Sequence, residues 1–386
     1  MEQPIDIVLR ARGGIGMMLN AGNSEKHYLE WEVTFRKPLK SSIWSQMPLD
    51  SDRDYTYDLR IGVDLNGRAV PTYECLRTSL PMSAKYDSPF KYLIADNQRA
   101  QIFDRSLGKL APFDVAIPQS DPKSIQLRLN SNAESDASRI LEADSRLYLS
   151  RMTFANEYPI PTWVRSMFTS MAHYPGFNIS ASSPVRTKAS EIRPDTVLEM
   201  QGNNLGTILH EVLTRSSNQR NAEQIRTFMS AAYPEFDEIF AETTFGSPPQ
   251  VLIRIREKGL QRNLELWDLS DGMLRFLCLA TSLFNPSPPP VVKIDEPESG
   301  LHPRLLPIVG DMIKTAAEDS QIIITTHSPD LLNSFELEDI AVISREHSKA
   351  VWSRPHSREA LRALLENVAG ENLGDLFKSG ELEVPS

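Results

Sequence analysis

One run of the sequence, from Val291 to Arg304, strongly constrains the sheet that this chain can form. It reads Val-Val-Lys-Ile-Asp-Glu-Pro-Glu-Ser-Gly-Leu-His-Pro-Arg, so a short apolar segment ends in two adjacent carboxylates and a turn. An apolar run bounded by turn residues is typical of a buried strand. In an open α/β sheet, ligands bind beyond the carboxyl ends of the strands. We therefore expect Asp295 and Glu296 to face a ligand.

The last third of the sequence alternates helical and extended patterns, which predicts an α/β core with a mainly parallel sheet. The predicted elements are a helix at 271–284, a strand at 291–295, a helix at 303–317, strands at 321–326 and 339–344, and a helix at 358–368.

The preceding two thirds of the sequence have a different hydrophobic pattern. Period-two alternation between residues 28 and 78 predicts half-buried antiparallel strands. The remaining predictions are a loop-rich tract at 81–136, a helix at 137–168 broken by Pro159 and Pro161, a connector at 175–200, helices at 204–215 and 221–243, and strands at 251–255 and 263–267.

The paired carboxylates suggest phosphate chemistry. Mg²⁺ prefers one or two carboxylates together with waters and substrate phosphates, which suits Asp295. Glu296 is then placed to polarise a water for attack on a γ-phosphate. On its own, such a carboxylate pair is more often a solvated turn.

Two neighbouring segments strengthen this interpretation. Residues 267–277 place Ser270 and Gly272 at the start of an amphipathic helix, where free N–H groups attract anions. Residues 321–332 begin with a strand rich in β-branched residues, and His327 follows directly after it. Ser270 could also be only a helix N-cap, and His327 could be a structural histidine.

In this order the three segments resemble those of ABC-type ATPases of the RecF/SMC-like branch, often described as AAA-family ATPases. The resemblance assigns Ser270 and Gly272 to the signature motif, although Leu-Ser-Asp-Gly-Met stands where Leu-Ser-Gly-Gly-Gln is usual. It assigns Asp295 and Glu296 to the Walker B motif, residues 299–302 to the D-loop and His327 to the switch histidine. Ser299 and the signature residues would then contact nucleotide. The implied fold is a P-loop NTPase core, ABC-ATPase-like, with an antiparallel β and helical insertion.

The resemblance also implies a phosphate loop, yet no Gly-x-x-x-x-Gly-Lys-Ser/Thr occurs in the 386 residues. Relatives place that loop near the N-terminus, where its backbone N–H groups and lysine hold the phosphates. We therefore expect either a domain shortened at its start, through a late start site or a gene lesion, or a second chain that supplies this loop.

Composition bounds the remaining possibilities. The chain is 40% hydrophobic and 24% charged, within the range of globular proteins. Two cysteines form no disulfide framework, which favours a reducing cytoplasm. No apolar stretch approaches the roughly 20 residues of a membrane span, so we expect no membrane partner. A net charge of −10 argues against a general nucleic-acid coat, so DNA contact is possible but unsupported.

The sequence thus predicts three regions: a β-rich part at 1–80 without its Walker A segment, an insertion or lid region at 81–260, and a C-terminal ATPase lobe at 261–386. The resemblance implies an enzyme that binds ATP and Mg²⁺ and switches shape through a nucleotide-dependent homodimer or heterodimer. DNA repair and phage defence are processes that such a switch could serve. The alternative is a non-hydrolysing subunit that binds a Walker A-bearing partner.

Overall fold

The fold was determined as a computed structural model of the chain. The residues that it describes are 10–11, 28–35, 54–63, 69–80, 88–96, 99–104, 109–112, 114–116, 126–128, 149, 158–187, 189–193, 195–244, 249–346, 349–355, 361 and 372–382.

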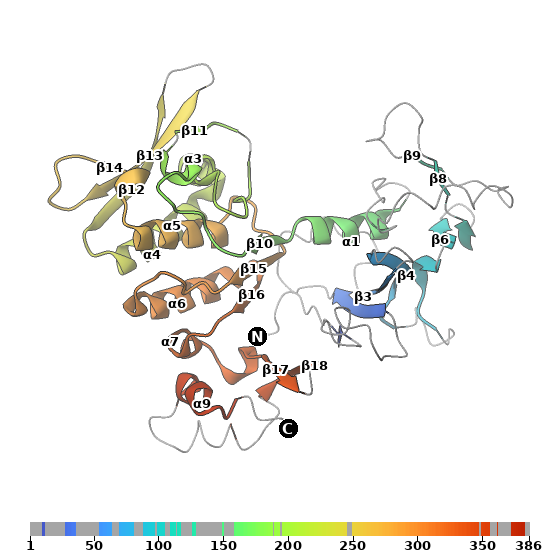
Figure 1. The fold of residues 1–386 in the computed structure, drawn as a ribbon. Coiled ribbons are helices and arrows are strands. Elements are labelled where there is room, and N and C mark those ends of the chain that lie inside the picture. The colour runs from blue at the N-terminus through green and yellow to red at the C-terminus, as the bar shows by residue number, and fades with distance from the viewer. Residues whose placement is uncertain are drawn as a thin grey trace. The chain divides into compact units, whose positions relative to one another are not determined.

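The chain divides into two compact units (Figure 1). The first consists of Met1–Thr169 with Ser344–Val351, and the second of Ser170–Ile343 with Trp352–Ser386. The division into regions 1–80, 81–260 and 261–386, which follows the sequence resemblance, stays a prediction.

The first unit contains a seven-stranded sheet in which strands that follow one another in the chain are antiparallel neighbours. Its strands are β1 (Arg10–Ala11), β2 (Tyr28–Phe35), β3 (Tyr55–Val63), β4 (Ala69–Thr78), β5 (Lys91–Asp96), β6 (Arg99–Asp104) and β7 (Lys109–Pro112). A separate antiparallel pair consists of β8 (Asp114–Ala116) and β9 (Gln126–Arg128). The antiparallel strands predicted between residues 28 and 78 are confirmed.

The prediction of a loop-rich tract at 81–136 is wrong, because β5 to β9 lie in it. Leu93 and Ile102 are fully buried and paired across β5 and β6, so they extend the sheet despite the polar residues around them. Cross-strand apolar pairs of this kind stabilise a sheet more than composition suggests.

Helix α1 (Pro159–Thr169) packs an aromatic edge onto this sheet. Its Phe168 ring lies 5.1 Å from that of Phe35 and 5.5 Å from that of Tyr57. Tyr158 is not helical and Pro159 is the first helical residue, which agrees with the break predicted at Pro159. The break predicted at Pro161 is wrong, because prolines in the first turn of a helix leave no intrahelical hydrogen bond unmade. Residues 137–148 and 150–157 of the predicted helix lie outside the described part.

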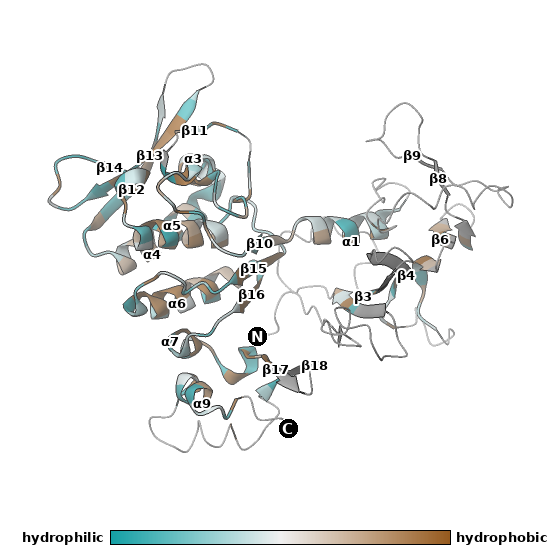
Figure 2. Ribbon diagram, in the orientation of Figure 1, coloured by the Kyte–Doolittle hydropathy of each residue, from teal (hydrophilic) through white to brown (hydrophobic). Residues whose placement is uncertain are grey.

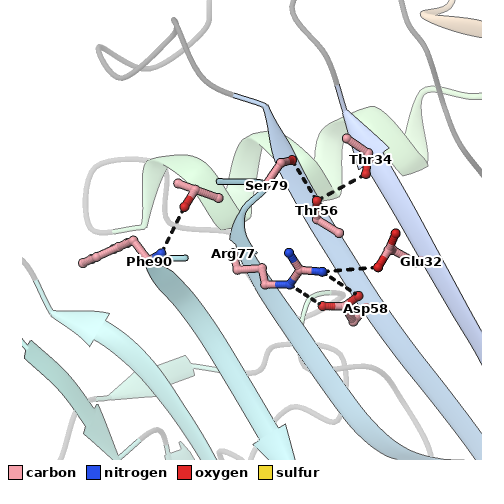
Figure 3. Close-up of polar contacts among 8 residues, drawn as sticks. Glu32, Thr34, Thr56, Asp58, Arg77, Ser79 and Phe90 are labelled. Atoms are coloured by element: carbon pink, nitrogen blue, oxygen red, sulfur yellow. Dashed lines mark hydrogen bonds and ion pairs between the residues drawn. The ribbon is translucent and has the colours of Figure 1, made fainter. Parts of the chain in front are cut away.

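Polar side chains of the same sheet pair with one another (Figure 3). The Arg77 guanidinium donates to Asp58 Oδ2 at 2.8 Å and to Glu32 Oε2 at 3.3 Å, so one cation joins three strands. The hydroxyls of Thr34, Thr56 and Ser79 form a second row at 3.2 and 2.8 Å.

The second unit is built on a parallel sheet in the order β10 (Ala172–Tyr174), β15 (Val291–Asp295), β16 (Gln321–Thr325). The α/β class is confirmed. The sheet is parallel here, whereas the strand pairs among β1 to β9 and among β11 to β14 are antiparallel. Figure 2 shows hydrophobic residues along β15 and β16.

The rest of this unit surrounds that sheet with helices and antiparallel strands. In chain order these are α2 (Pro184–Thr187), β11 (Ser190–Glu191), α3 (Leu205–Thr214), α4 (Gln219–Ala232), β12 (Phe236–Thr244), β13 (Gln250–Glu257), β14 (Leu264–Glu265), α5 (Asp271–Leu283), α6 (Leu306–Ala316), α7 (Pro329–Leu332) and α9 (Leu373–Ser379). The chain also forms the strand pair β17 (Val342–Glu346) and β18 (Lys349–Ser353).

Two predictions for this unit need correction. The helix predicted at 221–243 ends at Ala232, because Tyr233 precedes Pro234, and the residue before a proline disfavours helix. Residues 236–244 form strand β12 instead. The connector predicted at 175–200 is packed into the core, where Val185 and Leu198 are each 3% exposed. The helix predicted at 358–368 lies outside the described residues except for Leu361.

No helix among the described residues is both long and apolar enough to span a membrane.

Burial makes both cysteines unreactive in the folded chain. It raises the pKa of Cys75 and raises the pKa of Cys278 to about 12. Because the thiolate is the reactive form, we expect an aromatic disulfide reagent to label neither thiol in native buffer and to label both in guanidinium chloride. Rapid labelling of one thiol in native buffer would contradict the packing around it.

Candidate functional site

Asp295 ends the central strand of the parallel sheet. Val292 and Ile294 point into the core, whereas Lys293 and Asp295 alternate to the opposite, more exposed face. Asp295 Oδ2 lies 3.1 Å from His173 Nε2, and its Oδ1 accepts from the Thr325 hydroxyl at 3.3 Å. The hydrogen bond from His173, with the nearby Lys293 charge, holds the pKa of Asp295 below its usual value. Asp295 is therefore ionised at neutral pH.

Glu296 has a strained backbone. Its φ is +45°, in the left-handed region that glutamate rarely adopts. The Glu296 N–H donates to the Thr325 carbonyl at 3.0 Å, and the Glu296 carboxylate accepts from the Ser299 hydroxyl at 3.0 Å. These bonds turn the chain sharply out of the strand and leave the Glu296 side chain exposed. Strain of this kind is concentrated at functional sites.

The two carboxylates line a pocket of about 500 Å³ beyond the carboxyl ends of β10 and β15. Ser299 lines it as well, together with Arg275 and the aromatic residue Phe177. A volume of this size is typical of small-molecule sites. The pocket thus combines negative charge, one cation and an apolar wall.

The start of helix α5 lies against the turn that follows β15. The Ser270 side chain accepts from the Met273 N–H at 3.3 Å, so Ser270 is the N-cap. A Cβ added to Gly272 would lie 3.7 Å from the Gly300 carbonyl oxygen, and one added to Gly300 would lie 2.7 Å from Arg275 Nε. The predicted signature and D-loop turns are therefore in direct contact within one chain.

A buried arginine fixes the turn before α5. The Arg186 guanidinium donates to the carbonyls of Ile179 and Leu269 at 2.8 and 2.7 Å and to Asp271 Oδ1 at 2.5 Å. Asp271 is one of two residues that depart from the usual signature, the other being Met273. Its carboxylate is explained by this contact, because it accepts a hydrogen bond that a glycine could not accept.

Arg186→Met should therefore destabilise the chain. It leaves two carbonyls without their donor, and we expect the free energy of unfolding to fall by about 3 kcal/mol. Urea denaturation measures the change. The matched control is Arg220→Met, since Arg220 is half exposed and pairs with Glu318 and Asp319 at the surface. That loss should stay below about 1 kcal/mol, and equal losses would reject the anchoring role.

His327 lies in the turn after β16 and is exposed. Its backbone N–H donates to Glu298 Oε1 at 3.1 Å, and no hydrogen bond to its imidazole is present among the described residues. His327 does not line the pocket. Its approach to a phosphate stays a prediction.

Of the predicted site residues, Asp295, Glu296 and Ser299 come together in the pocket. Ser270, Gly272 and His327 do not line it, although Gly272 lies next to Gly300, which follows the lining residue Ser299. Sequence reasoning missed three further residues: His173, Arg275 and Glu298. His173 lies outside every element predicted from the sequence, and Arg275 carries no signal beyond its place on the helix predicted at 271–284. Glu298 stands within the Val291–Arg304 run.

The donor atoms around Asp295 fit magnesium. Asp295 offers a carboxylate beside the Thr325 hydroxyl, and Mg²⁺ completes such a partial set with waters and phosphate oxygens. No cluster of three or more histidine, cysteine or carboxylate side chains that could hold a metal occurs in the described part of the chain. That Asp295 holds the ion stays a prediction, and the ion would offset phosphate charge when bound.

Solved structures with a similar arrangement include heads of SMC proteins. An SmcHead bound to the C-winged helix domain of ScpA is 13% identical, with a TM-score of 0.40 and coverage of 87% of this chain and 79% of that chain. The SMC head domain from Thermotoga maritima is 12% identical, with a TM-score of 0.35 and coverage of 86% and 76%. An Smc head domain derived from Pyrococcus furiosus is 12% identical, with a TM-score of 0.40 and coverage of 92% and 84%.

A comparison with curated proteins gave no match. A family model described as "AAA domain, putative AbiEii toxin, Type IV TA system" matches residues 29–333, which is well over half of the chain. The TM-scores above lie below 0.5, so the family match carries the assignment. It confirms the predicted membership of the AAA-family ATPases and agrees with an α/β P-loop NTPase fold. The chain therefore belongs to this AAA domain family.

Proposed function

We propose that this protein binds and hydrolyses ATP with Mg²⁺, and that nucleotide closes it into a head-to-tail dimer of the RecF/SMC-like, ABC-type kind. The main observation in support of this proposal is that the strained Glu296 lies beside the ionised Asp295, in a pocket at the carboxyl ends of parallel strands. Asp295 would hold Mg²⁺, Glu296 would orient the attacking water, and His327 would contact the γ-phosphate.

The open side of the parallel sheet supports a phosphate loop next to β16. Among the described residues, β16 pairs only with β15, and Ile323 on this edge strand is 37% exposed. Parallel strands are normally covered on both faces, and their continuous apolar sequences reflect that burial. A further strand and helix carrying the phosphate loop would cover β16.

The signature turn supports a dimer. Ser270 and Asp271 are exposed at the start of α5, and the neighbouring Trp267 is 52% exposed. In the proposed dimer Ser270, Gly272 and Ser299 contact the nucleotide held by the other subunit. Hydrolysis would then open the dimer and couple ATP state to shape. DNA repair, phage defence and toxin control stay open as the process it serves.

The alternative is a non-hydrolysing subunit that completes the active site of a Walker A-bearing partner. It is favoured by the sequence, which contains no Gly-x-x-x-x-Gly-Lys-Ser/Thr in its 386 residues.

Phosphate release from ATP distinguishes the two functions. The chain is assayed alone, and again in a mixture with a candidate partner that carries a phosphate loop, which is also assayed alone. Turnover by the chain alone supports the ATPase. Turnover only in the mixture supports the composite site. Absence of nucleotide binding and turnover in both would reject both functions.

A further inference from the structure

Glu298 joins the two turns that carry the proposed catalytic groups. It lies two residues after Glu296, in the turn that follows β15. Its Oε1 accepts from the Thr326 hydroxyl at 2.7 Å and from the His327 N–H at 3.1 Å. The Thr326 hydroxyl in turn accepts from the Ser328 N–H at 3.0 Å. One carboxylate oxygen is thus linked, directly or through the Thr326 hydroxyl, to three consecutive residues that lie 28 to 30 positions later in the sequence.

The second oxygen of Glu298 is shielded from solvent. Oε2 is buried and has no hydrogen-bond partner among the described residues. A buried acceptor without a donor is costly, so this carboxylate is not an incidental surface contact. The cost of burying the Glu298 carboxylate is consistent with a role in fixing the position of the residues that it contacts.

The other side of the His327 turn is held independently. Helix α7 begins at Pro329, and the Gly374 N–H at the start of α9 donates to Asn333 Oδ1 at 2.7 Å. A Cβ at Gly374 would lie 2.5 Å from the Pro329 carbonyl oxygen, so the two helices touch. Leu332 and Leu376 also belong to one buried cluster. Removing the Glu298 carboxylate should therefore release the His327 turn without unfolding α7.

We infer that Glu298 is a positioning residue that sets His327 relative to Glu296. The inference rests on the proposed function, because it gives His327 and Glu296 their roles in ATP hydrolysis. Any displacement of the turn after β15 is then transmitted to His327 through Glu298 Oε1. The proposed water-orienting group and the proposed phosphate contact move as one body.

Amide hydrogen exchange of the full chain tests the link directly. Glu298→Ala removes the acceptor, and we expect exchange at residues 326–328 to rise by about tenfold or more. Glu298→Gln keeps an acceptor oxygen and should stay near wild type. Glu318→Ala is the control, because Glu318 is exposed and pairs only with Arg220 in the described structure. Unchanged exchange in Glu298→Ala would overturn the inference.

Kinetics separate positioning from structural support. In the assembly that hydrolyses ATP, Glu298→Ala should lower kcat by about 10- to 100-fold with little change in KM, and Glu298→Gln should restore most of it. Combined with His327→Gln, the losses should be clearly less than additive. Additive losses, or a normal kcat, would reject the inference. If no assembly hydrolyses ATP, the proposed function fails, while the exchange result still decides whether Glu298 holds the turn.

Discussion

Glu296→Gln should lower kcat for ATP hydrolysis by about 100-fold or more while leaving nucleotide binding in place. The amide keeps the size of the side chain and an oxygen that can accept from Ser299, as the carboxylate does at 3.0 Å. It removes the negative charge that would polarise the attacking water. Steady-state phosphate release and equilibrium binding of a fluorescent ATP analogue measure the two effects.

Loss of turnover in Glu296→Gln does not by itself assign the water-orienting role to Glu296, so two further variants serve as comparisons. Glu318→Gln makes the same chemical change at an exposed surface position and should leave kcat unchanged. Asp295→Asn should raise the Mg²⁺ concentration that gives half-maximal turnover, because it removes the charge of the proposed ligand. Turnover by Glu296→Gln at the wild-type rate would reject Glu296 as the group that orients the water.

The sequence identified the strand-to-turn segment well because its signals are local. Residues 291–295 form β15 as predicted, and Ser270 caps a helix that begins at Asp271, since an apolar run and an N-cap serine need no distant partner. The helix predicted at 221–243 is shorter in the structure, because Pro234 disfavours a helical Tyr233. Local signals also failed for β5 to β9, whose strands depend on cross-strand burial.

The site was only partly predictable, for a physical reason. The sequence places Asp295 and Glu296 together because they are neighbours, but the pairing of His173 with Asp295 spans 122 residues. Register between β10 and β15 creates that contact, and register is decided by the whole sheet. Arg186 and Asp271 are likewise joined only by the fold. The departure of the signature from glycine at Asp271 has an explanation once Arg186 is located.

Ser270→Arg should abolish ATP-dependent dimer formation. Ser270 is exposed at the start of α5, next to the contact between Gly272 and Gly300, so a long charged side chain there would project into the proposed interface. Burying an unpaired charge in an interface costs about 3 kcal/mol or more, which weakens association by at least about 100-fold. Sedimentation with and without ATP, in the Glu296→Gln background, measures this association.

The substitution also removes the hydrogen bond from the Met273 N–H to Ser270, so a loss of dimer could reflect a frayed helix. Ser270→Ala separates the two causes, because it deletes the cap at a cost of about 1 kcal/mol but adds no bulk. We expect Ser270→Ala to dimerise with ATP and Ser270→Arg to remain monomeric. A normal ATP-dependent dimer of Ser270→Arg would remove the signature role from this turn. Equal loss in both variants would assign the effect to the missing hydroxyl, which both variants lack, and not to the bulk of arginine at an interface. Thermal unfolding of Ser270→Ala then decides between its two roles, because loss of the cap lowers the stability of the monomer and loss of a nucleotide contact does not.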